Sequence, residues 1–192
     1  MQVISWSQFL EEGLPGNSYA MTIGVFDGVH RGHQSLINRV VSHSADTVPV
    51  VITFRGNYKA AENISIQSLQ ERLEIFEQLG VKITIVIDFT ESFCRMKGIE
   101  FFEILLKRSN IGFFAVGSSF RCGCRLDTDA EAIREFFASH NIQTETLDEV
   151  TEGTQPISSS RIRAAIASGD LQLAQAMLGR SVETCGAFRE KC

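Results

Sequence analysis

The sequence predicts an α/β fold: a doubly wound, Rossmann-like parallel sheet of about five strands with helices on both faces, plus a small C-terminal helical segment. Two observations predict it. Short apolar runs rich in β-branched and aromatic residues alternate with longer stretches of helical period, as in parallel strands joined by helical crossovers. The 192 residues are also 44% hydrophobic, which suffices for one buried core.

The predicted elements alternate along most of the chain. The strands are expected at residues 20–26, 49–54, 82–87, 112–116 and 142–147. The helices between them are expected at residues 32–44, 68–79, 99–107 and 129–140. Each connection is then a helical crossover between parallel strands, which is the pattern of a doubly wound sheet.

Two short helices are expected after the last strand, at residues 161–167 and 171–178. Gly169 and Gly179 stand where they would end, and Asp170 can cap the second. We therefore expect residues 1–180 to form one domain and residues 181–192 to form a C-terminal tail.

Composition excludes several classes of partner. A net charge of -5 argues against broad electrostatic binding to nucleic acid or to an anionic membrane surface. The N-terminus has no basic segment followed by an apolar run, so a cytoplasmic location is expected. The five cysteines are odd in number and irregularly spaced, which indicates reduced thiols. Cys122-x-Cys124 lacks a second close pair, so no metal ligands are expected in the chain.

The first candidate site is the junction GVFDGVHRGH at residues 24–33, which follows a predicted strand and opens a predicted helix. In open parallel sheets, ligands bind outside the carboxyl ends of the strands, and unpaired amides at a helix start attract phosphate. His30 and His33 share one helix face, and Gly32 lets a phosphate approach the backbone. Two imidazoles there can donate hydrogen bonds to phosphate oxygens in a transition state.

The second candidate site is ISSSRIR at residues 157–163, directly before an apolar helix. Serines commonly cap a helix start, but positive charge in the first turn opposes the helix dipole. An anionic ligand would offset that penalty, so Arg161 and Arg163 indicate a phosphate site. A third segment, GSSFRCGCR at residues 117–125, follows another strand, and a plain loop is about equally consistent with it.

These segments resemble the nucleotidyltransferases that carry an H-x-G-H motif near the N-terminus and an I-S-S-T-x-x-R-like motif near the C-terminus. More closely, the chain is similar to the FAD synthetase (FMN adenylyltransferase) domain of bacterial bifunctional riboflavin kinase/FAD synthetases. GVFDGVHRGHQSLI at residues 24–37 is similar to that family's first signature, and ISSSRIR to its last. The resemblance covers roughly residues 1–180. The tail resembles the start of the linker to a riboflavin kinase domain, which this sequence lacks.

The resemblance implies transfer of AMP from ATP to the phosphate of FMN by direct in-line displacement, giving FAD and pyrophosphate, with Mg²⁺ accompanying ATP. It implies a catalytic set, an ATP-binding set and a flavin-binding set. The catalytic set is His30, His33, Ser159 and Arg161. The ATP-binding set is Gly24, Val25, Phe26, Asp27, Gly28, His30, Gly32, His33, Gly117, Ser158, Ser159, Ser160, Arg161 and Arg163. The flavin-binding set is Thr53, Phe54, Asn57, Ser119, Phe120 and Arg121.

The expected partners are therefore the small molecules ATP and FMN, bound by a monomer, with FMN supplied by a separate riboflavin kinase or another source. Two alternatives stay open. One is a degenerate homologue that binds nucleotide or flavin without turnover, which is favoured by Ser119, where the family has an acidic or amide residue, and by the altered segment at residues 55–57. The other is a nucleotidyltransferase that uses another phosphorylated acceptor.

Overall fold

A sheet of six parallel strands forms the centre of the molecule within residues 1–56 and 65–182, the part of the chain that the computed structural model describes. Its order is β1-β4-β3-β2-β5-β8. The strands are β1 (Gln2–Ser5), β2 (Leu14–Ile23), β3 (Thr47–Phe54), β4 (Ile83–Ile87), β5 (Ser109–Gly117) and β8 (Gln143–Leu147).

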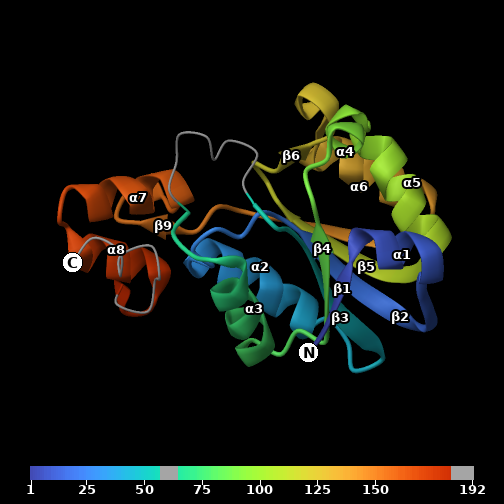
Figure 1. Ribbon diagram of the computed structural model, residues 1–192, viewed down its shortest axis with the longest axis horizontal. Coiled ribbons are helices and arrows are strands. Elements are labelled where there is room, and N and C mark those ends of the chain that lie inside the picture. Colours follow the sequence, from blue (N-terminus) through green and yellow to red (C-terminus); the bar gives the residue numbers. More distant parts are fainter. Residues whose placement is uncertain (57–64, 183–192) are drawn as a thin grey trace.

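Helices cover both faces of this sheet (Figure 1). Aromatic side chains of α1 (Trp6–Glu12), α5 (Gly98–Arg108) and α6 (Ala130–Ser139) pack on one face, and α2 (Arg31–Val41) and α3 (Leu69–Gln78) pack on the other. The short helix α4 (Glu91–Arg95) adds Phe93 to the first of these cores. The predicted doubly wound α/β fold is confirmed.

The chain reverses its direction of travel across the sheet between β2 and β5. From β2 it passes through α2, β3 and α3 to β4, and then crosses back through α4 and α5 to β5 on the other side of β2. The register pairs Ile23 with Ile52 of β3 and Thr22 with Ala115 of β5, so the carboxyl ends of these strands meet at one edge. Such a reversal leaves a crevice at the strand ends, where ligands of this fold bind.

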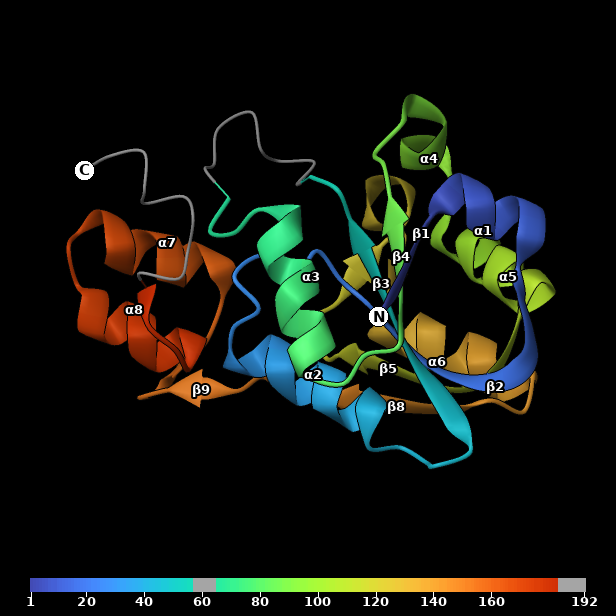
Figure 2. The same cartoon turned by 60° about the horizontal axis from the view of Figure 1, so that its bottom comes forward.

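The C-terminal segment forms a separate small helical layer. The helices α7 (Ser159–Ala167) and α8 (Leu171–Leu178) pack together beyond α2 and α3 (Figure 2). Asp170 caps α8 through the backbone N–H of Leu173 at 3.0 Å, and Gly179 ends it in the left-handed conformation, as predicted. Helix α7 begins two residues earlier than expected, because Ser158 caps it.

Three elements near the sheet edge and after β4 were missed by the sequence prediction. Strand β1 has only four residues and is largely exposed, so it lacks the apolar run that indicates a strand. Helix α1 follows it directly, with Ser5 and Gln8 forming a capping box that the sequence does contain. Helix α4 has five residues, too few for a helical period. The sheet therefore has six strands within the described residues, where about five were expected.

Two short antiparallel pairs flank the main sheet. Strand β6 (Arg121–Cys122) pairs with β7 (Thr128–Asp129) around a 3₁₀ turn at Cys124–Leu126, and β9 (Thr151–Glu152) pairs with β10 (Gln155–Pro156) just before α7.

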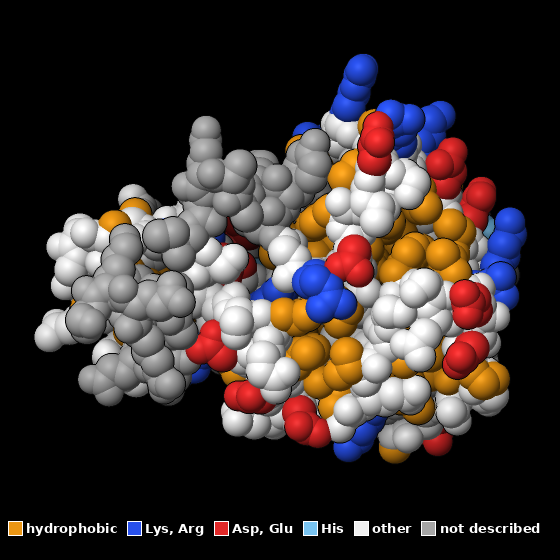
Figure 3. Space-filling model, in the orientation of Figure 1, with side chains coloured by type: hydrophobic (Ala, Val, Ile, Leu, Met, Phe, Trp, Pro, Cys, Tyr) orange, Lys and Arg blue, Asp and Glu red, His pale blue; other side chains and the backbone are white. Residues whose placement is uncertain are grey.

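Acidic and basic side chains are interspersed over the face of the molecule seen in Figure 3.

Candidate functional site

The turn between β2 and α2 has an unusual backbone. Strand β2 ends at Ile23, three residues before the predicted end, because the chain leaves the extended conformation there. Phe26 has φ of 54° and Val29 has φ of 35°, a region in which bulky and β-branched residues are strained, and Gly28 has φ of 83°. Tertiary contacts must therefore hold this turn in place.

Side chains from distant segments bind the carbonyl groups of the turn. The Arg72 guanidinium, on α3, donates to the Val25 carbonyl at 2.6 Å, and the Ser159 hydroxyl, on α7, donates to the Asp27 carbonyl at 2.7 Å. Arg180 donates to the Gly28 carbonyl and, at 2.9 Å, to the Val29 carbonyl. The carbonyl oxygens thus point to these donors, and helices α3 and α7 fix the geometry of the turn.

The two predicted histidines form a stacked pair at the start of α2. His30 is the N-cap, and its Nδ1 accepts the backbone N–H of His33 at 3.4 Å. The two rings are 3.5 Å apart between centroids with an angle of 19° between their planes. The Phe26 ring meets His33 edge-on at 5.2 Å, so the strained turn also supports the second imidazole.

Burial keeps both imidazoles neutral. Burial, assisted by the Arg180 guanidinium, lowers the pKa of His30 to about 4 from its usual value of 6.5. Burial, His30 and nearby arginines lower the pKa of His33 well below that value. Since Nδ1 of His30 accepts a hydrogen bond, its proton is assigned to Nε2. Each ring can therefore donate one hydrogen bond to a ligand at pH 7 without carrying charge.

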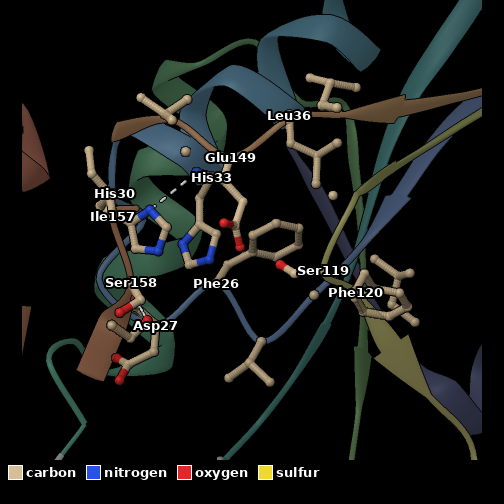
Figure 4. A pocket seen from close by; sticks show the side chains of 18 of the residues that line it. Phe26, Asp27, His30, His33, Leu36, Ser119, Phe120, Glu149, Ile157 and Ser158 are labelled. Carbon is tan, nitrogen blue, oxygen red and sulfur yellow. Dashed lines mark hydrogen bonds between the residues drawn. The ribbon is translucent and has the colours of Figure 1, made fainter. Parts of the chain in front are cut away.

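A cavity of about 450 Å³ opens beside this pair, at the strand ends where the sheet reverses (Figure 4). Its size suits a small-molecule ligand. Three segments form most of its wall: the turn after β2, the loop after β5, and the loop from β8 to the start of α7. Of the predicted site residues, those lining it are Gly24, Val25, Phe26, Asp27, His30, Gly32, His33, Gly117, Ser119, Phe120, Arg121, Ser158 and Ser159.

The arginines of the ISSSRIR segment are directed elsewhere. Arg161 donates to the carbonyls of Gln155 and Pro156 at 2.8 and 3.2 Å, and to that of Glu152 at 2.9 Å, so it holds the β9–β10 hairpin. Arg163 is past the first helical turn and pairs with the Asp27 carboxylate at 2.7 Å. Neither lines the cavity, and their binding of phosphate stays a prediction.

Three other predicted ATP-binding or flavin-binding positions also lie off the cavity wall. Ser160 accepts a hydrogen bond from Arg163 at 3.2 Å, and Gly28 lies in the turn where an added Cβ would meet the Ile66 side chain. Thr53 is fully buried and donates to the Val25 carbonyl at 3.2 Å.

The predicted flavin residues divide into two groups. Ser119, Phe120 and Arg121 line the cavity with the nucleotide motif. Phe54 instead stacks on Phe89 with centroids 4.4 Å apart. Asn57 lies outside the described residues.

Sequence reasoning missed the loop after β8 and the buried Arg72. Asp148, Glu149 and Val150 line the cavity but belong to a polar stretch with no motif. Arg72 is 4% exposed, although it is charged. A charged residue on the apolar side of the predicted α3 period was the available signal.

The described residues contain no group of three or more His, Cys, Asp or Glu side chains able to hold a metal ion. Burial and the nearby Asp127 raise the pKa of the Cys122 thiol to about 12.

No helix within the described residues is long and apolar enough to cross a membrane.

The fold and the site together define a Rossmann-like α/β domain with a nucleotide-sized cavity at its switch point. The sequence profile of the FAD synthetase family matches residues 15–161, and the chain belongs to that family.

The chain is 31% identical over 166 residues to the FAD synthetase of Listeria monocytogenes, covering 83% of this chain and 68% of that protein. It is 27% identical over 182 residues to the bifunctional riboflavin kinase/FMN adenylyltransferase of Escherichia coli K12, covering 90% of this chain but only 58% of that protein.

A solved structure confirms the fold. A protein from Streptococcus pneumoniae described as a macrolide-efflux protein superposes with a TM-score of 0.82 at 25% identity, covering 94% of this chain and 60% of that one.

Proposed function

We propose that this chain is an FMN adenylyltransferase, which transfers AMP from ATP to the phosphate of FMN and releases FAD and pyrophosphate. The observation that carries the proposal is the neutral, stacked pair His30 and His33 at the α2 N-terminus, facing a cavity of about 450 Å³. Membership of the FAD synthetase family supplies the acceptor.

The reaction is a single in-line displacement. An oxygen of the FMN phosphate forms a bond to the α-phosphorus of ATP, and the bond from that phosphorus to the bridging oxygen breaks. The electron pair leaves with pyrophosphate, and no enzyme nucleophile or proton transfer is needed. The task of the protein is therefore to hold the two substrates in line and to stabilise charge on the phosphate oxygens.

The residues of the cavity suit that task. His30 Nε2 and one nitrogen of His33 would donate to non-bridging oxygens as charge builds up, and their neutrality avoids proton loss to the phosphate. The free amides at the start of α2 and the Ser158 hydroxyl would add further donors. Mg²⁺, when bound with ATP, would neutralise charge on the departing pyrophosphate.

The flavin would lie toward the loop after β5. Phe120 and Arg121 line that side of the cavity, and an aromatic ring with a guanidinium suits a planar, phosphorylated ligand. The acceptor is thus proposed to approach from this side, opposite α7.

Arg161 and Arg163 support the site indirectly, through other protein groups. Arg161 holds the hairpin that precedes α7, and Arg163 holds the side chain of Asp27, a residue of the cavity wall, so we assign them a positioning role and keep direct phosphate contact as a prediction. A monomeric state, a cytoplasmic location and a separate source of FMN likewise stay predictions.

The test is an assay of purified protein with ATP, Mg²⁺ and FMN, in which FAD and pyrophosphate are measured over time. His33→Ala is compared with His140→Ala, a substitution at the exposed end of α6. We expect equal amounts of FAD and pyrophosphate, lost in the first variant and kept in the second. Binding of both substrates without product would contradict the proposal, as would pyrophosphate release only with another phosphorylated acceptor.

A further inference from the structure

The cavity has an acidic side that the phosphate-binding motifs do not account for. Asp148 and Glu149 follow β8 and line the cavity. In Figure 4 the Glu149 carboxylate points into the cavity, toward the side where His33, Phe26 and Ser119 lie. An acid directed into a site for an anionic substrate needs a specific reason.

Two acidic residues of the cavity wall, Asp27 and Glu149, differ in the partners of their carboxylates. The Asp27 carboxylate turns to the backbone N–H groups of Ile66 and Gln67 at 2.9 and 3.2 Å and to Arg163. Within residues 1–56 and 65–182, by contrast, Glu149 makes no ion pair or side-chain hydrogen bond. Its carboxylate is therefore available to a ligand in the cavity.

The chemistry of a carboxylate restricts which part of a nucleotide can lie beside it. An ionised carboxylate only accepts hydrogen bonds, and its charge repels phosphate. In ATP the donors are the two ribose hydroxyls and the amino group of the base. The ribose is the group joined directly to the α-phosphate, and the α-phosphate belongs beside His30 and His33. Glu149, directed toward His33, is placed to meet the sugar.

We propose that Glu149 binds the vicinal 2′- and 3′-hydroxyls of the ATP ribose and so selects ribonucleotides over deoxyribonucleotides. Two carboxylate oxygens match two adjacent hydroxyls, the recognition that acidic residues provide for ribose in other dinucleotide-binding folds. The inference rests on the proposed adenylyl transfer, since it takes ATP as the ligand. It adds a specificity-determining residue outside the motifs that resemble the family.

The test is titration calorimetry of the full chain with ATP, 2′-deoxyATP, 3′-deoxyATP and inosine triphosphate, without FMN and with Mg²⁺ either present or absent. We expect the wild-type protein to bind ATP roughly tenfold or more tightly than either deoxy analogue, because a hydrogen bond to a charged group is lost. Glu149→Ala should bind ATP more weakly than the wild type by the same factor, and it should bind the deoxy analogues as tightly as the wild type does. Glu149→Gln, which keeps one acceptor oxygen, should retain part of the preference.

Glu103→Gln is the control, because it removes an exposed carboxylate on α5 that does not line the cavity, and it should keep the wild-type ratio. The proposal is overturned if Glu149→Ala keeps the wild-type preference for ATP, if it weakens ATP and deoxy analogues equally, or if its loss depends on Mg²⁺. It is also overturned if the lost discrimination is between ATP and inosine triphosphate. Ribose selection through Glu149 in a protein that makes no FAD would support this inference and contradict the proposed function.

Discussion

The Arg163 guanidinium donates to the Asp27 carboxylate at 2.7 Å, which joins helix α7 to the turn after β2. The Asp27 side chain is 6% exposed, and burial raises its pKa despite this partner. Removing Arg163 would leave a buried carboxylate without its ion-pair partner, and such losses are destabilising.

We therefore expect Arg163→Ala to lower the free energy of unfolding by about 2 to 4 kcal/mol, and Arg163→Lys to lower it by less. Urea unfolding followed by circular dichroism measures both. Arg134→Ala, which breaks an exposed pair with Glu131 on α6, is the control and should leave the transition in place. Equal stability of the Arg163→Ala and wild-type proteins would show that the ion pair is not structural.

Loss of either stacked histidine should abolish most turnover. His30→Ala and His33→Ala each remove a neutral donor at the α2 N-terminus, and losing one such donor typically costs about 10²- to 10³-fold in rate. Steady-state FAD formation with saturating ATP and FMN measures the effect. A rate within about threefold of the wild type in both variants would contradict transition-state stabilisation by this pair.

The buried histidines should also make stability depend on pH. His30 has a folded-state pKa of about 4, below its unfolded value of 6.5, so between these values the unfolded chain binds a proton that the folded chain does not. The contribution of His30 to the free energy of unfolding is complete above pH 6.5, and it is lost as the pH falls toward 4. The expected slope from this group is about 1.4 kcal/mol per pH unit.

Thermal unfolding between pH 7 and pH 5 tests this expectation. His30→Gln should lose stability less steeply than the wild type on acidification, whereas His140→Gln, at an exposed position, should follow the wild-type slope. Parallel curves for all three proteins would show that His30 is not held neutral by the fold.

Arg72 should matter for both stability and catalysis. It donates to the Val25 carbonyl at 2.6 Å, the Thr53 hydroxyl at 3.1 Å and the Phe54 carbonyl at 3.0 Å, and so connects β3 to the turn after β2. Arg72→Met should lower kcat at least tenfold through displacement of that turn. Arg72→Lys, which keeps the charge and reaches fewer acceptors, should recover part of the rate.

A simple loss of folded protein must be separated from this effect of Arg72. The rate is therefore expressed per folded molecule, quantified by near-ultraviolet circular dichroism, and ATP affinity is measured in parallel. A normal kcat per folded molecule in Arg72→Met would mean that the residue only stabilises the sheet.

The sequence could predict the parts of the site whose geometry is local. His30 and His33 are three residues apart, so helix geometry alone puts them on one face, and the structure stacks them. Asp170 and Gly179 likewise bound α8 through contacts within a few residues. Strand β1 was not predicted, because its place in the sheet depends on pairing with β4. In that pairing Gln2 lies beside Ile83, 81 residues away in the chain.

The partners of the charged side chains could not be predicted, because they depend on tertiary structure. The helix-dipole argument predicts an anionic ligand for Arg161, and it gives no indication that the carbonyls of the β9–β10 hairpin also accept from its guanidinium. Glu149 had no motif to identify it, and only the meeting of three strand ends brings it to the cavity. Local chemistry indicates what a residue can bind, and the fold decides which partner is near.

The strained turn after β2 depends on residues that the ribosome adds much later. Ser159 and Arg180, which hold the carbonyls of Asp27 and Val29, follow those residues in the chain by 132 and 151 positions. Every strand of the main sheet is already synthesised before either donor exists. During translation the sheet can therefore assemble ahead of the cavity at its edge, and the cavity is completed only when α7 and the residues after α8 have emerged.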